Sequence, residues 1–320
     1  MSIASEITRI TTNIANAYTS CNNKGATMPV TQNSANLATC IDSIPTGGGG
    51  SSTKYGVSMD SIIGDVNASG VLQQPSVNGN YVFTGVKDIA ITGLQYVGYQ
   101  KKAIVSVSFP DLENINGMSA LYYAFQYSNV ASINFPKLET ITNDTAMQYA
   151  FGYTPLTSAS FPELTVITGN NAISYCFAGC SSFTSISFPK LERIGKSTVS
   201  QYVSDYGQLS RLLYNVEGVE TLTFPELKEV YCTGSSAAYS GTFAYNNKVK
   251  KMYFPKLDTI TYGSGASTTN QNACKLIFSN CDSLAELHFA SANQSAIQAT
   301  AGYSTLWGRG AGNATVYFDL

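Results

Sequence analysis

A phrase of twelve residues recurs along the chain and constrains its fold more than any other feature. It reads VASINFPKLETI at residues 130–141, and its other copies stand at 104–115, 156–167, 183–194, 219–230 and 249–260. Counted from the Phe, apolar residues stand at minus five, minus two, plus three and plus six, and Pro stands at plus one. Because such self-similarity is the signature of a repeat architecture, the sequence predicts a solenoid.

Each phrase predicts one short strand followed by a turn. The alternation of polar and apolar residues up to the Phe is typical of a half-buried strand, and the Pro cannot donate a further ladder hydrogen bond. An aromatic residue ten or eleven positions upstream predicts an irregular or short helical return behind the strand, at Phe125, Phe151, Phe177, Phe243 and Phe278. One strand and one return cannot bury their apolar faces alone, so stacked copies must form the core.

Degenerate copies extend the array at both ends. Tyr99 takes the place of the return aromatic in the first copy, and the segment LAELHFA retains the strand pattern without the Pro. We therefore expect nine parallel strands in one sheet, ending at Phe83, Phe109, Phe135, Phe161, Phe188, Phe224, Phe254, Phe289 and Phe318.

The chain ahead of the array predicts a short helical head. A heptad seam in residues 2–24 indicates a helix, through Ile3, Ile7, Ile10, Ile14, Ala17 and Cys21. Two arrangements fit this helix: a short coiled coil that makes the chain a homo-oligomer, or a hairpin with a second helix near 34–44 through Leu37, Ile41 and Ile44. The predicted organisation is a head at 1–45, a Gly/Ser linker at 46–52, a cap or shoulder at 53–80 and the solenoid at 81–320.

Composition excludes several classes of partner. Charged residues make up 12% of the chain and the net charge is −2, whereas globular proteins carry roughly 25% charged residues. This balance argues against nucleic acid or an anionic membrane surface as partner. No apolar run reaches the length of a membrane span. We expect an extracellular, cell-surface or virion protein, although the first residues lack the features of a secretory signal. Either the start of the sequence has been trimmed, or the protein leaves its cell by another route.

The sequence offers no catalytic, cofactor or metal site. It contains one His, which excludes zinc ligation by paired His, and no Gly run has the context of a phosphate loop. The seven Cys are odd in number and lack framework spacing. We interpret them as reduced and structural, with Cys180 and Cys281 at the same repeat position. The chain is expected not to be an enzyme.

The outward-facing strand positions, minus one and minus three, give the candidate binding site. Along most of the array they are Ser or Thr, and toward the C-terminal end they become aromatic and charged. The candidate residues are Lys251, Tyr253, Glu286, His288 and Tyr317, which would lie on neighbouring strands about 5 Å apart. The alternative is that these residues are polar only because an exposed sheet face must be.

Two further patterns concern the turns and the insertions. The residue after the Pro alternates in sign, through Asp111, Lys137, Glu163, Lys190, Glu226 and Lys256, and stacked copies would therefore place opposite charges together. Insertions rich in Tyr, Ser, Gly and Asn lengthen the returns at 195–218, 231–241 and 261–275. They are interpreted either as binding loops or as tolerated surface loops.

The phrase and its return, as in AFAGCSSFTSISFPKLERI, resemble the BspA-type leucine-rich repeats of bacterial surface proteins over residues 80–320. The resemblance implies a leucine-rich-repeat-like solenoid that binds a protein or glycan on a cell surface. It departs from the general pattern because Leu replaces the ladder Asn, so Leu must pack the turn, at Leu112, Leu138, Leu164, Leu191, Leu227 and Leu257.

The head, GATMPVTQNSANLATCIDSIP at residues 25–45, is similar to N-terminal stretches of prophage-encoded tail and minor structural proteins. This second resemblance implies a phage tail-associated protein that recognises the host. The alternative is a bacterial cell-surface adhesin.

Overall fold

A computed structural model describes the solenoid and part of the head. The described residues are 10–15, 17–18, 31–37, 62–63, 80–83, 86–89, 94–198, 207–232, 241–262, 276–300, 303–305 and 314–320. The chain divides into two compact units, Met1–Ser51 and Ser52–Leu320. The finer division of the second unit into a cap at 53–80 and a solenoid at 81–320 stays a prediction.

The first unit is helical where it is described. Residues 10–15 and 17–18 are helical, and so are residues 34–37. The buried hydroxyl of Tyr18 donates to the backbone carbonyl of Asn33 at 2.8 Å, which joins the two segments. Ile10 on the seam is 46% exposed. The hydrogen bond from Tyr18 to Asn33 is a contact that a helical hairpin needs. The predicted homo-oligomer stays a prediction. The seam and hairpin residues outside the described residues are Ile3, Ile7, Cys21, Ile41 and Ile44.

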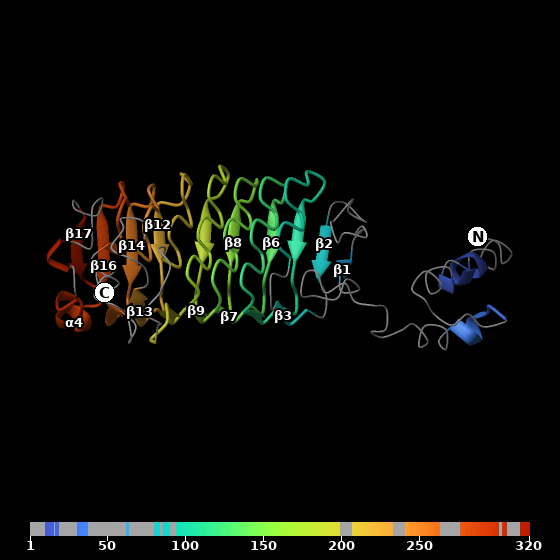
Figure 1. Ribbon diagram of the computed structural model, residues 1–320, viewed down its shortest axis with the longest axis horizontal. Helices are drawn as coiled ribbons and strands as arrows, with labels where there is room; N and C mark the ends of the chain where they lie inside the picture. Colours follow the sequence, from blue (N-terminus) through green and yellow to red (C-terminus); the bar gives the residue numbers. More distant parts are fainter. Residues whose placement is uncertain are drawn as a thin grey trace. The chain divides into compact units, whose positions relative to one another are not determined.

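The nine predicted strands are present, and each precedes or includes its Phe. Neighbouring strands pair in parallel wherever a ladder joins two of them, and they follow one another in chain order along the solenoid (Figure 1). They are β2 (Asn80–Phe83), β4 (Ser106–Ser108), β6 (Ser132–Asn134), β8 (Ser158–Ser160), β10 (Ser185–Ser187), β12 (Thr221–Thr223), β14 (Lys251–Phe254), β16 (Glu286–Phe289) and β17 (Thr315–Phe318).

The prediction of one continuous sheet is wrong in detail. The ladders form three groups, β1-β2-β4-β6, β8-β10 and β12-β14-β16-β17. The extra strand β1 (Ile62–Ile63) belongs to the region expected to be a cap, and it pairs antiparallel with β2.

A second sheet corrects the expectation of one strand per copy. Seven further parallel strands form one sheet in the order β15-β13-β11-β9-β7-β5-β3. They are β3 (Asp88–Ile89), β5 (Asn114–Ile115), β7 (Thr140–Ile141), β9 (Val166–Ile167), β11 (Arg193–Ile194), β13 (Glu229–Cys232) and β15 (Thr259–Tyr262). The apolar residue at plus six is their buried member. Most of these strands have only two residues, too few for an alternating pattern to stand out in the sequence.

The returns are mostly series of turns, so of the two predicted forms, irregular or short helical, the irregular one is present in them. A residue with left-handed backbone recurs every fourth position, as at Ser119, Tyr123 and Tyr127. Alternate amides donate to the next copy, as Leu121 does to the carbonyl of Ala146, while the amides between them bond three residues back. An α-helix needs every amide for bonds within the segment, so a return that shares half of its donors with the next copy cannot be one.

The connection from β16 to β17 contains short helical elements. The 3₁₀ turn η4 (Ser291–Asn293) leads into α4 (Gln294–Gln298), and η5 (Tyr303–Thr305) precedes β17. Ile297 of α4 is buried against the core, so this helix covers apolar surface at the C-terminal end of the array.

The core is built from two columns of stacked Phe rings. All nine strand Phe side chains form one column, with successive ring centroids 4.3 to 5.9 Å apart. The return column includes Phe125, Phe151 and Phe177, and Phe151 contacts Phe135 of the strand column at 6.1 Å. The turn residues Leu112, Leu138, Leu164, Leu191, Leu227 and Leu257 are all buried, which confirms that Leu packs the turn.

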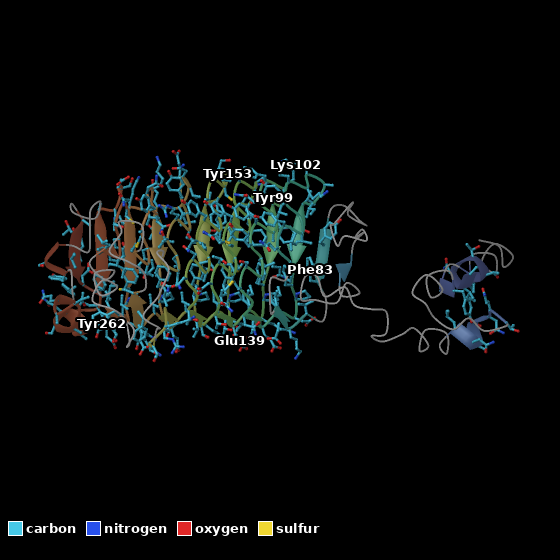
Figure 2. All side chains as sticks on the ribbon, viewed as in Figure 1. Phe83, Tyr99, Lys102, Glu139, Tyr153 and Tyr262 are labelled. Carbon is cyan, nitrogen blue, oxygen red and sulfur yellow. The ribbon has the colours of Figure 1, made fainter. Side chains whose placement is uncertain are left out.

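The alternating charges form pairs instead of a continuous ladder. Within the described residues, ion pairs join Lys137 to Asp111 at 2.9 Å, Lys190 to Glu163 at 2.6 Å and Lys256 to Glu226 at 2.6 Å, and the intervening steps have none. Figure 2 shows how evenly the side chains are distributed along the array, with Glu139 on the edge opposite Tyr153. Each of these three ion pairs joins one copy to its neighbour, so the charges at this position link the copies in separate pairs.

Four cysteines are buried and form no disulfide, as predicted, at Cys176, Cys180, Cys232 and Cys281. The thiol of Cys180 donates to the carbonyl of Phe151, and that of Cys281 donates to the carbonyl of Phe243, each at 3.2 Å. The shared repeat position of these two cysteines is therefore a structural one. Cys21, Cys40 and Cys274 lie outside the described residues.

The predicted insertions are shorter than expected. Residues 231–232 belong to β13, residues 261–262 belong to β15, and residues 207–218 include an ordinary return. The apolar alternation in these stretches is too brief to separate strand from loop in the sequence. The remaining parts, 199–206, 233–240 and 263–275, lie outside the described residues, and their role in binding stays a prediction.

The Phe column predicts a large cost for truncating one ring. Phe161 is buried between Phe135 and Phe188, with ring centroids 5.8 and 5.4 Å away. Phe161→Ala should lower the free energy of unfolding by about 3 to 5 kcal/mol, because it leaves a cavity among rings that cannot collapse. Urea denaturation measures this loss. Ser160→Ala on the exposed face is the control, and a loss below about 1 kcal/mol for Phe161→Ala would contradict the column.

The ion pairs predict a salt-dependent effect of charge reversal. Glu163→Lys places like charges together at the Lys190 contact and should destabilise the protein slightly, by up to about 1 kcal/mol at low salt. The double variant Glu163→Lys/Lys190→Glu should restore stability because it rebuilds the pair. Urea midpoints at low and high salt test this, and a loss that salt does not diminish would show that the charges are not in contact.

Candidate binding site

The five candidate residues lie side by side on the last strands of the array. In the register of β14, β16 and β17, Lys251 is opposite Glu286, and Tyr253, His288 and Tyr317 follow one another across the three strands. Because parallel strands in register place like positions together, the sequence-based grouping is reproduced in space. The structure thus brings all five into one cluster.

An aromatic stack forms the centre of this cluster. The His288 imidazole lies between Tyr253, at a centroid distance of 4.4 Å, and Tyr317, at 4.7 Å, with the rings nearly parallel. Stacking on both sides leaves His288 only 8% exposed, whereas Tyr317 is 38% exposed at the end of the stack. His288 therefore cannot offer a ring face to a partner, and Tyr317 can.

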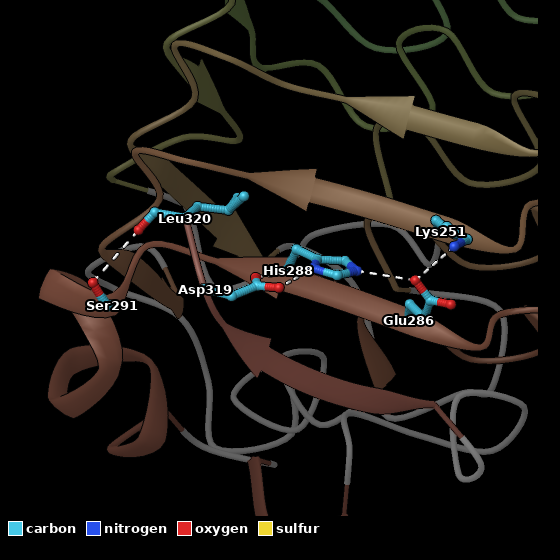
Figure 3. A network of polar contacts seen from close by, with 6 residues as sticks. All are labelled: Lys251, Glu286, His288, Ser291, Asp319 and Leu320. Atoms are coloured by element: carbon cyan, nitrogen blue, oxygen red, sulfur yellow. Dashed lines mark hydrogen bonds and ion pairs between the residues drawn. The ribbon is translucent and has the colours of Figure 1, made fainter.

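A polar network fixes the imidazole in its plane (Figure 3). Its Nε2 lies 3.1 Å from a Glu286 oxygen, and its Nδ1 lies 2.9 Å from Asp319. Glu286 also pairs with the Lys251 amine at 2.8 Å. A neutral imidazole donates through one nitrogen only, and an imidazolium donates through both. The network therefore orients the ring and holds two carboxylates beside it.

The charges of the network shift two pKa values. The hydrogen bond from Lys251 is the main cause that lowers the pKa of Glu286, and the bond to His288 is the next. The same contact with Glu286 raises the pKa of Lys251. Near neutral pH both groups are therefore ionised, and the cluster presents an ion pair beside an aromatic edge.

Asp319 is a member of the cluster that sequence reasoning missed. It follows Phe318 directly and so occupies the place that Pro holds in the full copies of the phrase. The presence of Asp instead of Pro in the last copy was the signal that could have identified this residue. An Asp at that position can contact the side chain of His288 on the neighbouring strand.

The rest of the outer face is a flat surface of small hydroxyl groups. Ser187 donates to the Ser160 hydroxyl at 2.9 Å, and the Asn134 amide donates to the Ser108 hydroxyl at 3.2 Å. These side chains satisfy one another across copies. The C-terminal cluster differs from this surface in size, charge and aromatic character.

Two features of the described residues concern metal binding and the reactivity of the thiols. No group of three potential metal ligands occurs among them. Burial raises the pKa of Cys281 to about 12, and burial also raises the pKa of the Cys176 and Cys180 thiols. Protonated, buried thiols are poor nucleophiles. In the part of the chain that the structure describes, no helix has the length and apolar character required to cross a membrane.

Comparison with known families identifies the repeat. The model of the BspA type leucine-rich repeat region matches residues 95–224, 144–268 and 174–305, with six copies. The chain belongs to this BspA type leucine-rich repeat family. No curated protein matches the chain. In this BspA type protein the fold is therefore one that usually serves binding, and the similarity of the head to phage tail proteins finds no further support.

The lowered pKa of Glu286 predicts an acid-sensitive contribution to stability. A carboxylate whose pKa is depressed by folding stabilises the protein above its ordinary pKa of about 4.3, and this contribution is lost as the pH falls through the lower folded value. Glu286→Gln should therefore be less stable than the parent at about pH 7, and the difference should shrink toward about pH 3. Urea midpoints of the two proteins measure it. A difference that grows on acidification would contradict the contact with Lys251.

Proposed function

We propose that the chain is a non-enzymatic adhesion protein whose solenoid binds a protein or glycan ligand on a cell surface. The observation that carries the proposal is the C-terminal cluster on the outer face, where Tyr253 and Tyr317 flank a fixed imidazole. Such a surface offers rigid aromatic groups and an ion pair, and Tyr is enriched among residues that dominate binding energy.

The five residues have unequal roles in this proposal. Tyr317 and Tyr253 contact the ligand through their exposed edges and faces, and Lys251 supplies a cation at the margin. His288 is buried by its neighbours and acts as a positioning residue together with Glu286 and Asp319. Rings that are already held in place lose little freedom on binding, so the arrangement favours affinity.

The place of the protein in its cell is a further part of the proposal. The first unit, Met1–Ser51, is a compact unit by itself. We propose that it attaches the solenoid to a larger structure, a phage tail or the cell envelope. Immunodetection of the chain in purified virions supports the tail, and its recovery in the envelope fraction of cells without virions supports a surface adhesin.

The sheet-face site predicts unequal effects of two substitutions. Glycan and protein arrays probed with the full chain provide the ligand, and its affinity is then measured by titration. Tyr253→Ala should weaken binding at least about tenfold, because it removes one ring of the stack. The matched control Ser132→Ala, on the hydroxyl surface, should leave the affinity unchanged.

A folding control keeps this test decisive. Both variants must retain the parental unfolding midpoint, because Tyr253 packs on His288 at 4.4 Å. Tyr317→Ala at the exposed end of the stack removes a contact without opening the cluster, and it should also weaken binding. Equal affinities of Tyr253→Ala, Tyr317→Ala and Ser132→Ala would overturn the proposed site.

A further inference from the structure

The first four returns carry two columns of tyrosine side chains. Each of these tyrosines occupies a left-handed backbone position, and the two columns stand four residues apart along a return. Successive rings are nearly parallel, with centroids 4.2 to 5.3 Å apart in the first column and 4.8 Å apart in the second. The first column is Tyr96, Tyr123, Tyr149 and Tyr175, and the second is Tyr127 and Tyr153, which together form the tyrosine surface.

The tyrosine surface presents ring edges and hydroxyl groups to solvent. Tyr96, Tyr127 and Tyr153 are 45%, 38% and 43% exposed, although stacking covers the faces between successive rings. Tyr99 makes T-shaped contacts with Tyr123 and Tyr127 and so joins the two columns. Because the rings are held by their neighbours, they lose little freedom when a partner binds.

The hydroxyl groups of this surface are protonated. Burial is the main cause that raises the pKa of Tyr123, Tyr149 and Tyr153, and neighbouring tyrosines raise it further. The hydroxyls of Tyr127 and Tyr153 make no hydrogen bond within the described part of the chain. They can therefore donate to a partner, and the edge of an aromatic ring is its positive side. Such a surface favours a partner that is rich in oxygen acceptors.

The returns that carry the tyrosine surface lack acidic side chains. None of the four contains an Asp or a Glu, at residues 94–105, 117–131, 145–157 and 171–184. Asp144 stands directly before the third return, and its carboxylate accepts hydrogen bonds from the backbone and side-chain amides of Asn170. The acidic group closest in sequence is therefore already bonded.

Two lysines stand at one end of the tyrosine surface. Lys101 and Lys102 belong to the first return, and the Asn129 amide donates to the Lys102 carbonyl at 2.7 Å, so Lys102 is next to the following return. Figure 2 shows Lys102 along the same edge as Tyr99 and Tyr153. Neither lysine makes an ion pair in the part of the chain that the structure describes. Their charges are thus available to an anionic partner.

We propose that the tyrosine surface binds a linear acidic polysaccharide whose chain runs across the returns. Lys101 and Lys102 attract its carboxylates, and the hydroxyls of Tyr127 and Tyr153 donate to its oxygen atoms. The surface shares no residue with the cluster on β14, β16 and β17. The inference therefore adds a second binding site to the proposed function and does not depend on the first.

The repeat of the tyrosine surface favours a polysaccharide over a polypeptide. Equivalent groups of neighbouring copies lie about 4.8 Å apart, which is close to the length of one sugar ring in a linear chain. An extended polypeptide presents side chains on one face only at every second residue, about 6.6 Å apart, and would fall out of step with the hydroxyls. A polysaccharide can offer one set of oxygen atoms to each copy.

Calorimetric titration of the full chain with three polymers tests the class of ligand. Polygalacturonate should bind at least about tenfold more tightly than poly-L-glutamate or its own methyl ester, which retains the sugar backbone without the charge. High salt should weaken the binding because it screens the lysines. Equal binding of the methyl ester would overturn the acidic class, and tighter binding of poly-L-glutamate would overturn the polysaccharide.

Conservative variants locate the site. Tyr127→Phe/Tyr153→Phe removes two hydroxyls, keeps both rings and should weaken polygalacturonate binding about tenfold. Lys101→Gln/Lys102→Gln should weaken it by at least as much and reduce its salt dependence. The matched control Tyr262→Phe, on β15, removes the hydroxyl of a tyrosine that is 37% exposed and should leave the affinity unchanged. Unchanged affinity in both double variants would overturn the site.

The outcomes separate this site from the proposed function. Polygalacturonate binding that survives Tyr253→Ala and is weakened in both double variants supports the second site, whatever the outer face binds. Binding that is lost in Tyr253→Ala and retained in the double variants belongs to the C-terminal cluster and overturns the inference. Urea midpoints of all variants are compared with the parent. If the tyrosine variant is less stable, the lysine variant on its own decides between these outcomes.

Discussion

Stacking of one copy on the next is the interaction on which this structure depends. A single copy exposes a strand Phe, a return aromatic and half of the amides of its return, and only a neighbour can cover or bond them. Because copies meet at about the spacing of paired strands, each position of the phrase becomes a column. One rule then governs each column, because a side chain at a given position lies next to the side chains at the same position of the neighbouring copies. Those side chains must be able to pack on or bond to one another.

The columns satisfy this rule in different ways. Phe and Tyr rings stack, Ser hydroxyls bond one another, and charged positions alternate in sign. The tyrosines at left-handed positions are strained, since that conformation costs a non-glycine residue about 1 to 2 kcal/mol. Ring stacking at about 0.5 to 1.5 kcal/mol per pair, together with the hydrogen bonds between copies, offsets that cost.

Much of this architecture was predictable because it repeats. Six clear phrases located the strands, the Phe column and the C-terminal cluster. The second sheet was missed because its strands are mostly two residues long, and Asp319 was missed because one substitution for Pro carries no pattern. The geometry of each return depends on hydrogen bonds between its amides and the next copy. Local sequence propensity carries no information about bonds between copies.

The equal spacing of the early copies has a consequence for how such a protein can vary. Phe83, Phe109, Phe135 and Phe161 are separated by three identical intervals of 26 residues. Loss or duplication of one such interval would join equivalent points of the phrase and leave every column continuous. The length of the array can therefore change by whole copies through unequal recombination, while the aromatic cluster at its C-terminal end is carried along unchanged. The length of the array can thus vary independently of the cluster at its C-terminal end.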